Sequence, residues 1–179
     1  MKEESNMNMF DLTGKKAIVV GGAGDLGKSM LEALVEAGAE AVVIGRGERT
    51  RNVADELSKK GYKVNPVYAE LTDRAQVDKS FEEALDILGG RVNILVNAAG
   101  IQRRHKCEEF PISDWDEVIE VNLTVSFRYC QLAALNMIPN GGGKIINVAS
   151  LISFFGGYTI PAYAASKGGI AQLTKALSN

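Results

Sequence analysis

The 179-residue sequence is poor in residues that hold metal ions. It contains two cysteines, Cys107 and Cys130, which lie far apart in the chain, and a single histidine, His105. Zinc sites need three or four closely spaced ligands, so we expect no metal site. The cysteines are typical of free, reduced thiols in a cytoplasmic protein.

Long apolar segments are also missing. A membrane-spanning helix needs about twenty consecutive apolar residues, and the sequence has no such run. Residues 1–9 are polar and include Lys2, Glu3 and Glu4, unlike the apolar core of a secretory signal. We expect a flexible tail over residues 1–9 and a cytoplasmic protein without a membrane partner.

An excess of positive charge is absent as well. The 20 Lys and Arg residues face 22 Asp and Glu residues, which gives a net charge of -2. Nucleic-acid-binding proteins usually carry a basic excess, so we expect no nucleic acid partner. With 46% hydrophobic and 23% charged residues, the composition is typical of a globular chain. The length suits one domain, residues 10–179.

Short apolar runs alternate with amphipathic segments along the chain. The expected strands are 16–20, 41–44, 63–68, 93–97 and 144–149. The expected helices are 26–37, 52–60, 73–88, a long helix over 113–138 with Ser113 as its N-cap, and a final helix from residue 163. Apolar strands alternating with helices form a parallel sheet covered on both faces. The predicted fold is α/β, a doubly wound sheet of Rossmann type.

A glycine-rich segment, Gly22-x-Gly24-x-x-Gly27, joins the first strand to the first helix. In such a turn, backbone N–H groups approach a diphosphate at the helix N-terminus. A helix start that merely needs small residues is the alternative, but the surrounding strand and helix favour a dinucleotide site. The residues that we expect to bind the cofactor here are Gly21, Gly22, Gly24, Asp25, Leu26 and Gly27.

An arginine follows the second strand, where dinucleotide-binding folds usually place an acidic residue for the adenosine ribose. Arg46 stands there, with Arg49 and Arg51 close behind. Guanidinium groups bind a phosphate bidentately, whereas a carboxylate would repel it. We therefore expect NADP to be preferred over NAD. In the alternative interpretation, these arginines are solvated and Glu48 binds the ribose.

Three residues near the end of the chain carry hydroxyl and amino groups. Ser150 follows the fifth strand, and Tyr163 and Lys167 share one face of the final helix because they are four apart. A phenol has an ordinary pKa near 10, and a neighbouring ammonium favours the phenolate. We expect Tyr163 to act as acid or base beside Lys167, with Ser150 holding a substrate oxygen. As an isolated pair, Tyr and Lys at this spacing are usually a surface contact.

Asn122 lies on the apolar side of the expected long helix. A buried amide needs hydrogen-bond partners, so Asn122 suits a polar relay. It would alternatively only cap or bend the helix.

Together, these motifs resemble the short-chain dehydrogenase/reductase family. The resemblance rests on the glycine turn, Asn97-Ala98-Ala99-Gly100, Asn122, Ser150 and the Tyr163-x-x-x-Lys167 pair, in that order. It implies Tyr163 as the catalytic acid or base, and Ser150 as the group that orients the substrate. Lys167 would activate Tyr163 and hold the nicotinamide ribose, and Asn122 would support a water-linked proton relay. The further cofactor contacts that the resemblance implies are Glu70, Leu71, Asn97, Ala98, Ala99 and Gly100.

Within the family, Gly100-Ile101-Gln102-Arg103-Arg104-His105 resembles the sugar-acid branch of gluconate 5-dehydrogenases and 2-deoxygluconate 3-dehydrogenases. Arg103, Arg104 and His105 are expected partners for a substrate carboxylate or hydroxyls, unless they form only an exposed basic loop. The implied activity is oxidation of a secondary alcohol or reduction of a ketone. The alternatives are a 3-oxoacyl thioester reductase and a non-catalytic dinucleotide-binding or oligomerisation module.

Length and three residues depart from the family pattern. Val20, Asp25 and Glu70 stand where members usually have Thr, Gly and Asp. Family members are longer, so we expect a C-terminally truncated domain whose fifth strand has an exposed edge. The resemblance also implies a homo-oligomer, either a dimer or a tetramer.

Overall fold

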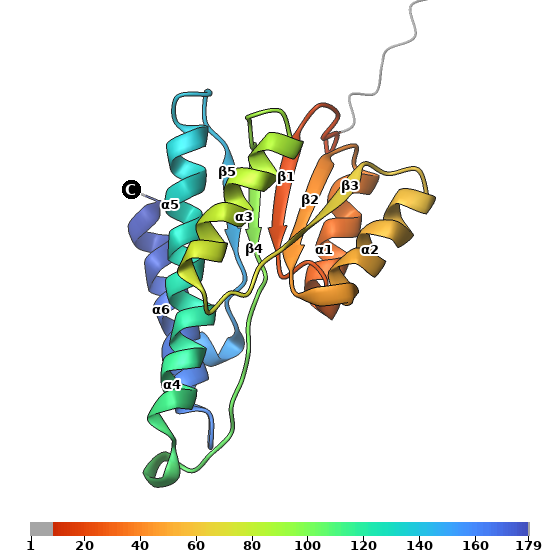
Figure 1. Cartoon of the computed structure of the whole chain (residues 1–179). Coiled ribbons are helices and arrows are strands. Elements are labelled where there is room, and N and C mark those ends of the chain that lie inside the picture. Colours follow the sequence, from red (N-terminus) through yellow and green to blue (C-terminus); the bar gives the residue numbers. More distant parts are fainter. Residues whose placement is uncertain (1–8, 179) are drawn as a thin grey trace, which may run out of the picture.

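The computed structural model describes residues 9–178, which fold around one parallel sheet. The sheet has the strand order β3-β2-β1-β4-β5. Its strands are β1 (Lys16–Val20), β2 (Glu40–Gly45), β3 (Val64–Tyr68), β4 (Ile94–Asn97) and β5 (Lys144–Asn147). The chain builds the sheet outward from β1, first through β2 and β3 on one side and then through β4 and β5 on the other, so the strand order reverses at β1. Strand β5 lies at an edge. The structure confirms the predicted doubly wound α/β fold (Figure 1).

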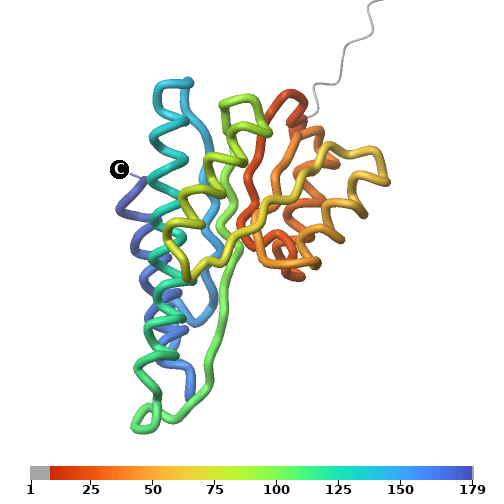
Figure 2. Tube along the Cα trace, in the orientation of Figure 1, coloured from red at the N-terminus to blue at the C-terminus, as the bar shows by residue number. Residues whose placement is uncertain are grey.

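Helices cover both faces of this sheet (Figure 1). They are α1 (Asp25–Glu36), α2 (Gly47–Lys59), α3 (Arg74–Ile87), α4 (Ile112–Ile119), α5 (Val125–Met137) and α6 (Pro161–Leu177). Short 3-10 turns, η1 (Cys107–Glu109) and η3 (Leu151–Ser153), precede α4 and α6. The trace in Figure 2 shows the long connection from β4 running away from the sheet to reach α4.

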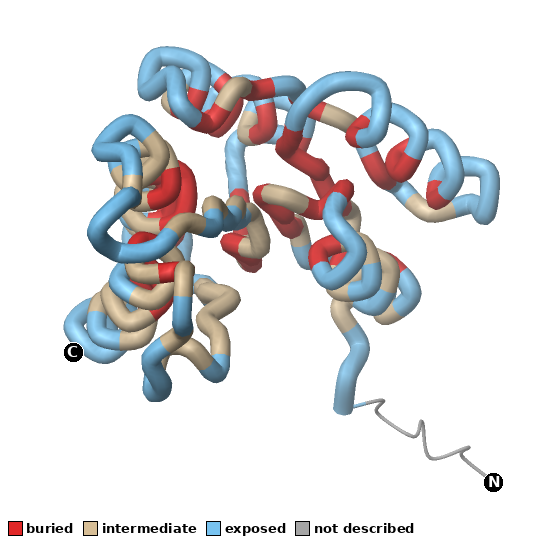
Figure 3. Tube along the Cα trace, turned by 90° about the horizontal axis from the view of Figure 1, so that it is seen from below, coloured by how far each residue is buried: buried red, intermediate tan, exposed pale blue. Residues whose placement is uncertain are grey.

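Two apolar cores, one on each face, fix the sheet between the helices. Side chains alternate along β1, so that Ile18 packs with α3 and α5 residues such as Phe81, while Val19 packs with α1 and α2 residues such as Leu31. Buried segments lie along the strands and the inward faces of the helices, and exposed segments lie on the outer loops (Figure 3). Apolar runs buried on both sides are what a parallel sheet requires.

The predicted long helix over 113–138 is wrong in two respects. It is divided into α4, a π-helical segment η2 (Glu120–Thr124) and α5. Ser113 is not the N-cap, because α4 already begins at Ile112 and Pro111 takes the extended N-cap conformation with a ψ of 135°. The amide of Trp115 then donates to the Pro111 carbonyl at 3.1 Å. The π-helical segment inserts extra backbone while both ends of the helix keep an apolar face.

Helix α2 also begins earlier than the predicted residue 52. Its first turn is charged, with Glu48 and Arg49, so apolar periodicity gives no signal there. Thr50 is nevertheless fully buried, and its hydroxyl donates to the Arg46 carbonyl at 3.1 Å. The other helix boundaries differ by a residue or two from those expected.

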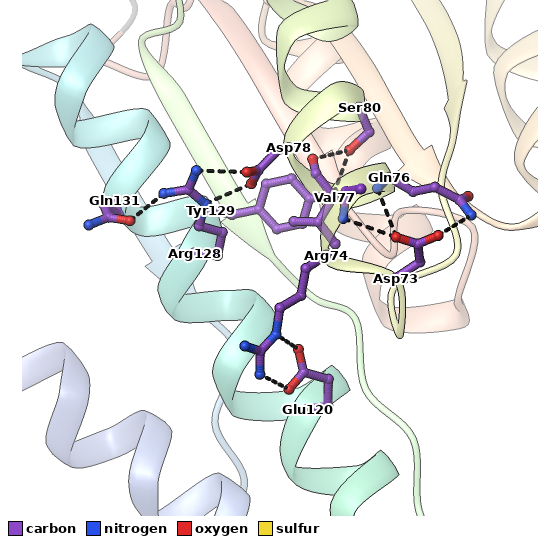
Figure 4. Close-up of polar contacts among 11 residues, drawn as sticks. Asp73, Arg74, Gln76, Val77, Asp78, Ser80, Glu120, Arg128, Tyr129 and Gln131 are labelled. Atoms are coloured by element: carbon purple, nitrogen blue, oxygen red, sulfur yellow. Dashed lines mark hydrogen bonds and ion pairs between the residues drawn. The ribbon is translucent and has the colours of Figure 1, made fainter.

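Polar contacts join α3 to the helical segments α5 and η2 (Figure 4). Arg128 donates to the Asp78 carboxylate from Nε at 2.6 Å and from Nη2 at 2.8 Å. Arg74 Nε lies 2.7 Å from Glu120 Oε1. Between these pairs, the buried Tyr129 hydroxyl lies 2.7 Å from the Ser80 hydroxyl. These contacts fix α3 against α5 and against η2, the segment that carries Asn122 of the site described below.

The expected tail over residues 1–9 lies, Met9 apart, outside the described residues. In the described part of the chain, no helix is both long enough and apolar enough to cross a membrane. Cys107 is exposed and Cys130 is buried, and both are free thiols.

Candidate active site

The glycine-rich turn between β1 and α1 is packed too tightly for side chains. Gly21 has a φ of 77°, and a Cβ atom there would lie 2.5 Å from Ala99 Cα. A Cβ on Gly27 would collide with the Gly21 carbonyl oxygen. The Gly24 amide donates to that same carbonyl at 3.0 Å, which closes the turn. The glycine turn therefore lies directly against the chain that leaves β4, and the first turn of α1 packs on the glycine turn.

A cavity of about 370 Å³ opens at the carboxyl ends of the strands, beside this turn. Its lining residues come from the ends of β1, β2, β3 and β4 and the segments that follow them, and from α2, α4 and η2. They are Gly21, Ala23, Gly24, Gly45, Arg46, Arg49, Glu70, Leu71, Thr72, Ala98, Ala99, Gly100, Ile101, Glu117 and Val121. Doubly wound sheets bind ligands at this edge, where the strand order reverses.

Most of the residues predicted to bind a cofactor line this cavity, and the others have different surroundings. Gly22 packs between Val19 and Val43 beneath the turn. Leu26 is largely exposed. Asn97 is buried, and its amide nitrogen donates to Asn147 Oδ1 at 2.9 Å, so it joins β4 to β5.

The β2 end of the cavity carries two arginines, each of which faces a carboxylate. Arg46 Nη1 lies 3.6 Å from Glu70 Oε2, and Arg49 Nη2 lies 2.6 Å from Asp25 Oδ1. Gly45 leaves no room for an acidic side chain at the end of β2, because a Cβ there would lie 2.7 Å from the Thr50 hydroxyl. The cavity therefore has cationic groups where NAD-specific folds have a carboxylate.

Lys167 lies at the other end, on α6. Its side chain is 4% exposed, and its Nζ donates to the Val148 carbonyl oxygen at 2.7 Å. The same Nζ lies 5.9 Å from the centroid of the Tyr163 ring. Burial lowers the pKa of the Lys167 ammonium, because a poorly solvated charge is disfavoured.

Asn122 is fully buried in η2, and its side chain forms hydrogen bonds with two other segments. Its Oδ1 accepts from the Ile101 amide at 2.8 Å, and its Nδ2 donates to the Ile101 carbonyl at 2.9 Å and to the Ser166 hydroxyl at 3.1 Å. The side chain thus connects the segment after β4 with α6. π-helical segments are frequent at functional sites, and here one carries Asn122.

Gly100 marks where these groups meet the cavity. A Cβ atom on Gly100 would lie 3.6 Å from Asn122 Oδ1 and 3.6 Å from Lys167 Nζ. Gly100 also lines the cavity. The amide and the ammonium group therefore converge on the part of the cavity that Gly100 lines.

Ser150 begins η3, the turn that follows β5. Its Oγ accepts from the Ile152 amide at 3.2 Å, and the Ser150 amide donates to the Ser153 hydroxyl at 3.2 Å. Ser153 in turn donates to the Lys167 carbonyl at 2.7 Å. This capping box fixes the Ser150 side chain relative to α6 and leaves its hydroxyl proton available for another acceptor.

Tyr163 lies half-buried in the first turn of α6, just after Pro161. The preceding loop is constrained, because Thr159 has a φ of 67°, a conformation that is rare for a β-branched residue. The Thr159 carbonyl accepts from the His105 amide at 3.0 Å. The loop after β4 is thereby joined to the start of the helix that carries Tyr163.

Three of the basic residues in the loop after β4, Arg103, Arg104 and His105, have different surroundings. Arg103 lies 2.7 Å from Glu117, and His105 Nε2 lies 2.7 Å from Asp114, so both are paired with α4. Arg104 is exposed and has no ion pair or hydrogen bond within residues 9–178. Among these three side chains, Arg104 has its guanidinium free for a ligand.

Several site residues were not predicted from the sequence. Gly45, Thr72, Glu117 and Val121 line the cavity, and Ser166 binds Asn122. Glu117 alone had a detectable signal, because a helical carboxylate following an arginine-rich loop is a natural ion-pair partner. The rest depend on how distant segments pack, which periodicity does not specify.

Chemically, the arrangement offers groups for binding an anion and, next to Gly100, groups for proton transfer. The tight glycine turn and the arginines suit a diphosphate and a further phosphate. The Tyr163 phenol, the Ser150 hydroxyl and the buried Lys167 suit a substrate oxygen that gains or loses a proton.

The family model described as short chain dehydrogenase matches residues 15–179. An uncharacterized oxidoreductase, YgcW of Escherichia coli, is 39% identical over 171 residues, which cover 96% of this chain and 65% of the relative. A 2-dehydro-3-deoxy-D-gluconate 5-dehydrogenase of Bacillus subtilis is 37% identical, with 95% of this chain and 66% of the relative covered. The chain thus spans about two thirds of the length of these curated relatives.

Among solved structures, a gluconate 5-dehydrogenase from Burkholderia cenocepacia in complex with NADP and tartrate is similar to this chain. The TM-score is 0.86 and the identity 36%, over 94% of this chain and 66% of that structure. At this identity the likeness extends to sequence as well as to fold.

Proposed function

Because the chain belongs to the short-chain dehydrogenase family, we propose that it interconverts a secondary alcohol and a ketone with NADP, or less favourably NAD, as cofactor. The observation that carries the proposal is the convergence of Asn122 and Lys167 on Gly100, which lines the cavity beside the glycine turn. The NADP named for the Burkholderia structure supports the choice of cofactor.

The residues of the cavity fit this cofactor. The backbone around Gly21 and Gly24 would hold the diphosphate, because side chains there would fill the space. Arg46 would bind the 2′-phosphate, with Glu70 and Leu71 beside the adenine, and Gly100 would lie towards the nicotinamide. When bound, the nicotinamide ring accepts the hydride in alcohol oxidation and donates it in ketone reduction.

The protein groups handle the proton. In oxidation, the Tyr163 phenolate accepts the proton of the substrate hydroxyl while a hydride leaves the carbon atom that bears this hydroxyl. In reduction, Tyr163 returns a proton to the substrate oxygen. Ser150 donates a hydrogen bond to this oxygen, which keeps it beside the phenol. Lys167 supplies positive charge next to Tyr163, and Asn122, through the Ile101 carbonyl, supports the path by which the proton reaches water.

We propose a sugar acid such as gluconate as the substrate. The relative from Bacillus subtilis and the structure from Burkholderia cenocepacia carry sugar-acid names, which support this class. Arg104 is the group proposed to bind the carboxylate, and Arg103 and His105, paired with α4, would hold the loop around it. The homo-oligomer and the cytoplasmic location stay predictions.

The first test is a titration of the chain with NADPH and NADH, followed by fluorescence energy transfer from its single tryptophan, Trp115. We expect saturable binding of both nucleotides, with NADPH bound more tightly. Absence of binding to either nucleotide would contradict the proposed cofactor site.

The second test is turnover by Tyr163→Phe. The variant should bind NADPH like the wild type and should lose about 100-fold or more of its turnover, because general acid–base catalysis contributes at least that much. Unchanged turnover would rule out the acid–base role of Tyr163.

Faster reduction of an acetoacetyl thioester than of 5-ketogluconate would rule out the sugar acid as the substrate. Binding of nucleotide without turnover of any substrate would indicate a non-catalytic module.

A further inference from the structure

The two arginines that line the cavity already have anionic partners within the chain. Arg49 Nη2 lies 2.6 Å from Asp25 Oδ1, and Arg46 Nη1 lies 3.6 Å from Glu70 Oε2. The shorter contact, Asp25 with Arg49, is within hydrogen-bond distance. Any phosphate that uses Arg49 must therefore compete with the Asp25 carboxylate.

Asp25 occupies an unusual place for an acidic side chain. It is the first residue of α1, directly after the glycine turn, where the fold would hold a diphosphate. Its side chain is 99% exposed, and it is not among the residues that line the cavity. The Asp25 carboxylate therefore does not line the cavity. It contacts Arg49 of α2, which does line the cavity.

The pair belongs to a row of ion pairs between α1 and α2. Lys28 binds Glu56 at 2.6 Å, farther along both helices. Asp25–Arg49 is the member of the row that involves a residue of the cavity, since neither Lys28 nor Glu56 lines it. The row thus contains a matched pair with the same chemistry outside the site.

We propose that Asp25 competes with the 2′-phosphate of NADP for Arg49, and that this competition lowers the affinity of the cavity for NADP. This inference rests on the proposed function, because it assumes a nucleotide in the cavity. The exposed pair is weak and screened by solvent, whereas a phosphate with nearly two charges binds a guanidinium bidentately. The nucleotide therefore displaces Asp25, at a cost in affinity that NADH, which has no 2′-phosphate, does not incur.

The test is a double-mutant cycle on nucleotide affinity, measured by titration calorimetry with NADPH and NADH. The variants are Asp25→Asn, Arg49→Gln and the double variant, with Glu56→Gln as the matched control. Asparagine keeps the size of the side chain at the helix start and removes its charge. Glu56→Gln removes the same charge from the same helix interface, away from the cavity.

Asp25→Asn should bind NADPH about three- to tenfold more tightly than the wild type, while its affinity for NADH should change less than twofold. In the Arg49→Gln background the same substitution should add nothing, because the arginine that it releases is missing. Glu56→Gln should leave both affinities unchanged.

Three results would overturn the inference. They are an unchanged NADPH affinity of Asp25→Asn, an equal gain for NADPH and NADH, and a gain that persists without Arg49. An equal gain would mean that Asp25 only repels the diphosphate. If the wild type and all variants bind neither nucleotide, the proposed function itself fails, and the inference falls with it.

Discussion

Lys167 combines burial with a charge, and that combination affects stability as well as chemistry. Burial lowers its pKa below the ordinary value of 10.5. Between the lowered pKa and 10.5, the unfolded chain binds more protons than the folded one, so the contribution of Lys167 to stability rises with pH in this window. Below the window, Lys167 is protonated in both states, and burial of its ammonium group destabilises the fold.

Lys167→Met should therefore lose this pH dependence. We expect the stability of the variant relative to the wild type to be greatest near pH 7 and to decline as the pH approaches 10.5, while turnover falls about 100-fold or more. Urea unfolding of both proteins at several pH values measures the difference, in which the other titrating groups cancel. A stability difference independent of pH would show that Lys167 titrates normally in the fold.

Arg104 differs from its neighbours in having no partner within residues 9–178, which makes it the best test of substrate class. Arg104→Ala should raise KM for gluconate about tenfold or more and leave KM for a neutral polyol almost unchanged, since a charged hydrogen bond contributes about 1.5–3 kcal/mol. Lys106→Ala, which removes a nearby exposed cation paired only at 3.8 Å with Glu109, is the control. Equal effects of Arg104→Ala on both substrates would exclude carboxylate recognition by this residue.

At the scale of elements, the junction of α3 and α5 depends on Tyr129. Desolvation raises the pKa of Tyr129 to about 12, above its ordinary value of 10.0. The folded state thus favours the neutral phenol, and the stability that this provides is complete below pH 10 and is lost as the pH rises from 10 to 12. Its bond to Ser80 joins the two helices at 2.7 Å (Figure 4).

Tyr129→Phe should lower the free energy of unfolding at pH 7 by about 1 kcal/mol, because Ser80 keeps its bond to the Val77 carbonyl. Above pH 10, the variant should lose less stability than the wild type. Thermal unfolding between pH 8 and pH 11 checks both points. Tyr158→Phe, at a phenol that is 84% exposed, should show neither effect.

Strands β1, β2 and β4 were predictable from sequence because burial on both faces leaves continuous apolar runs. Helix α3 was also predictable, since Asp73 caps it by accepting from the Ala75 and Gln76 amides. The division between α4 and α5 was not, because the apolar stripe continues through the π-helical segment. Its signal was Asn122, an amide in an apolar stripe that satisfies its bonds with Ile101 and Ser166.

At the scale of the whole molecule, the sequence predicted which strand ends carry the site, since the carboxyl ends of parallel strands share one edge. The order and chemistry of the motifs thus indicated most of the cavity lining. The pairing of Asp25 with Arg49 could not be predicted, because it depends on how α1 meets α2.

The close contact between Gly21 and Ala99 is possible because Gly21 has no Cβ atom. The turn after β1 and the chain after β4 approach so closely that a methyl group on Gly21 would have to separate them. The Ala98 amide donates to the Val20 carbonyl at 2.9 Å and holds the two sides together, and the missing side chain of Gly21 lets them approach this closely. A redesigned variant must therefore keep Gly21. Substitutions that change the nucleotide preference belong on α2, where the side chains have room to change.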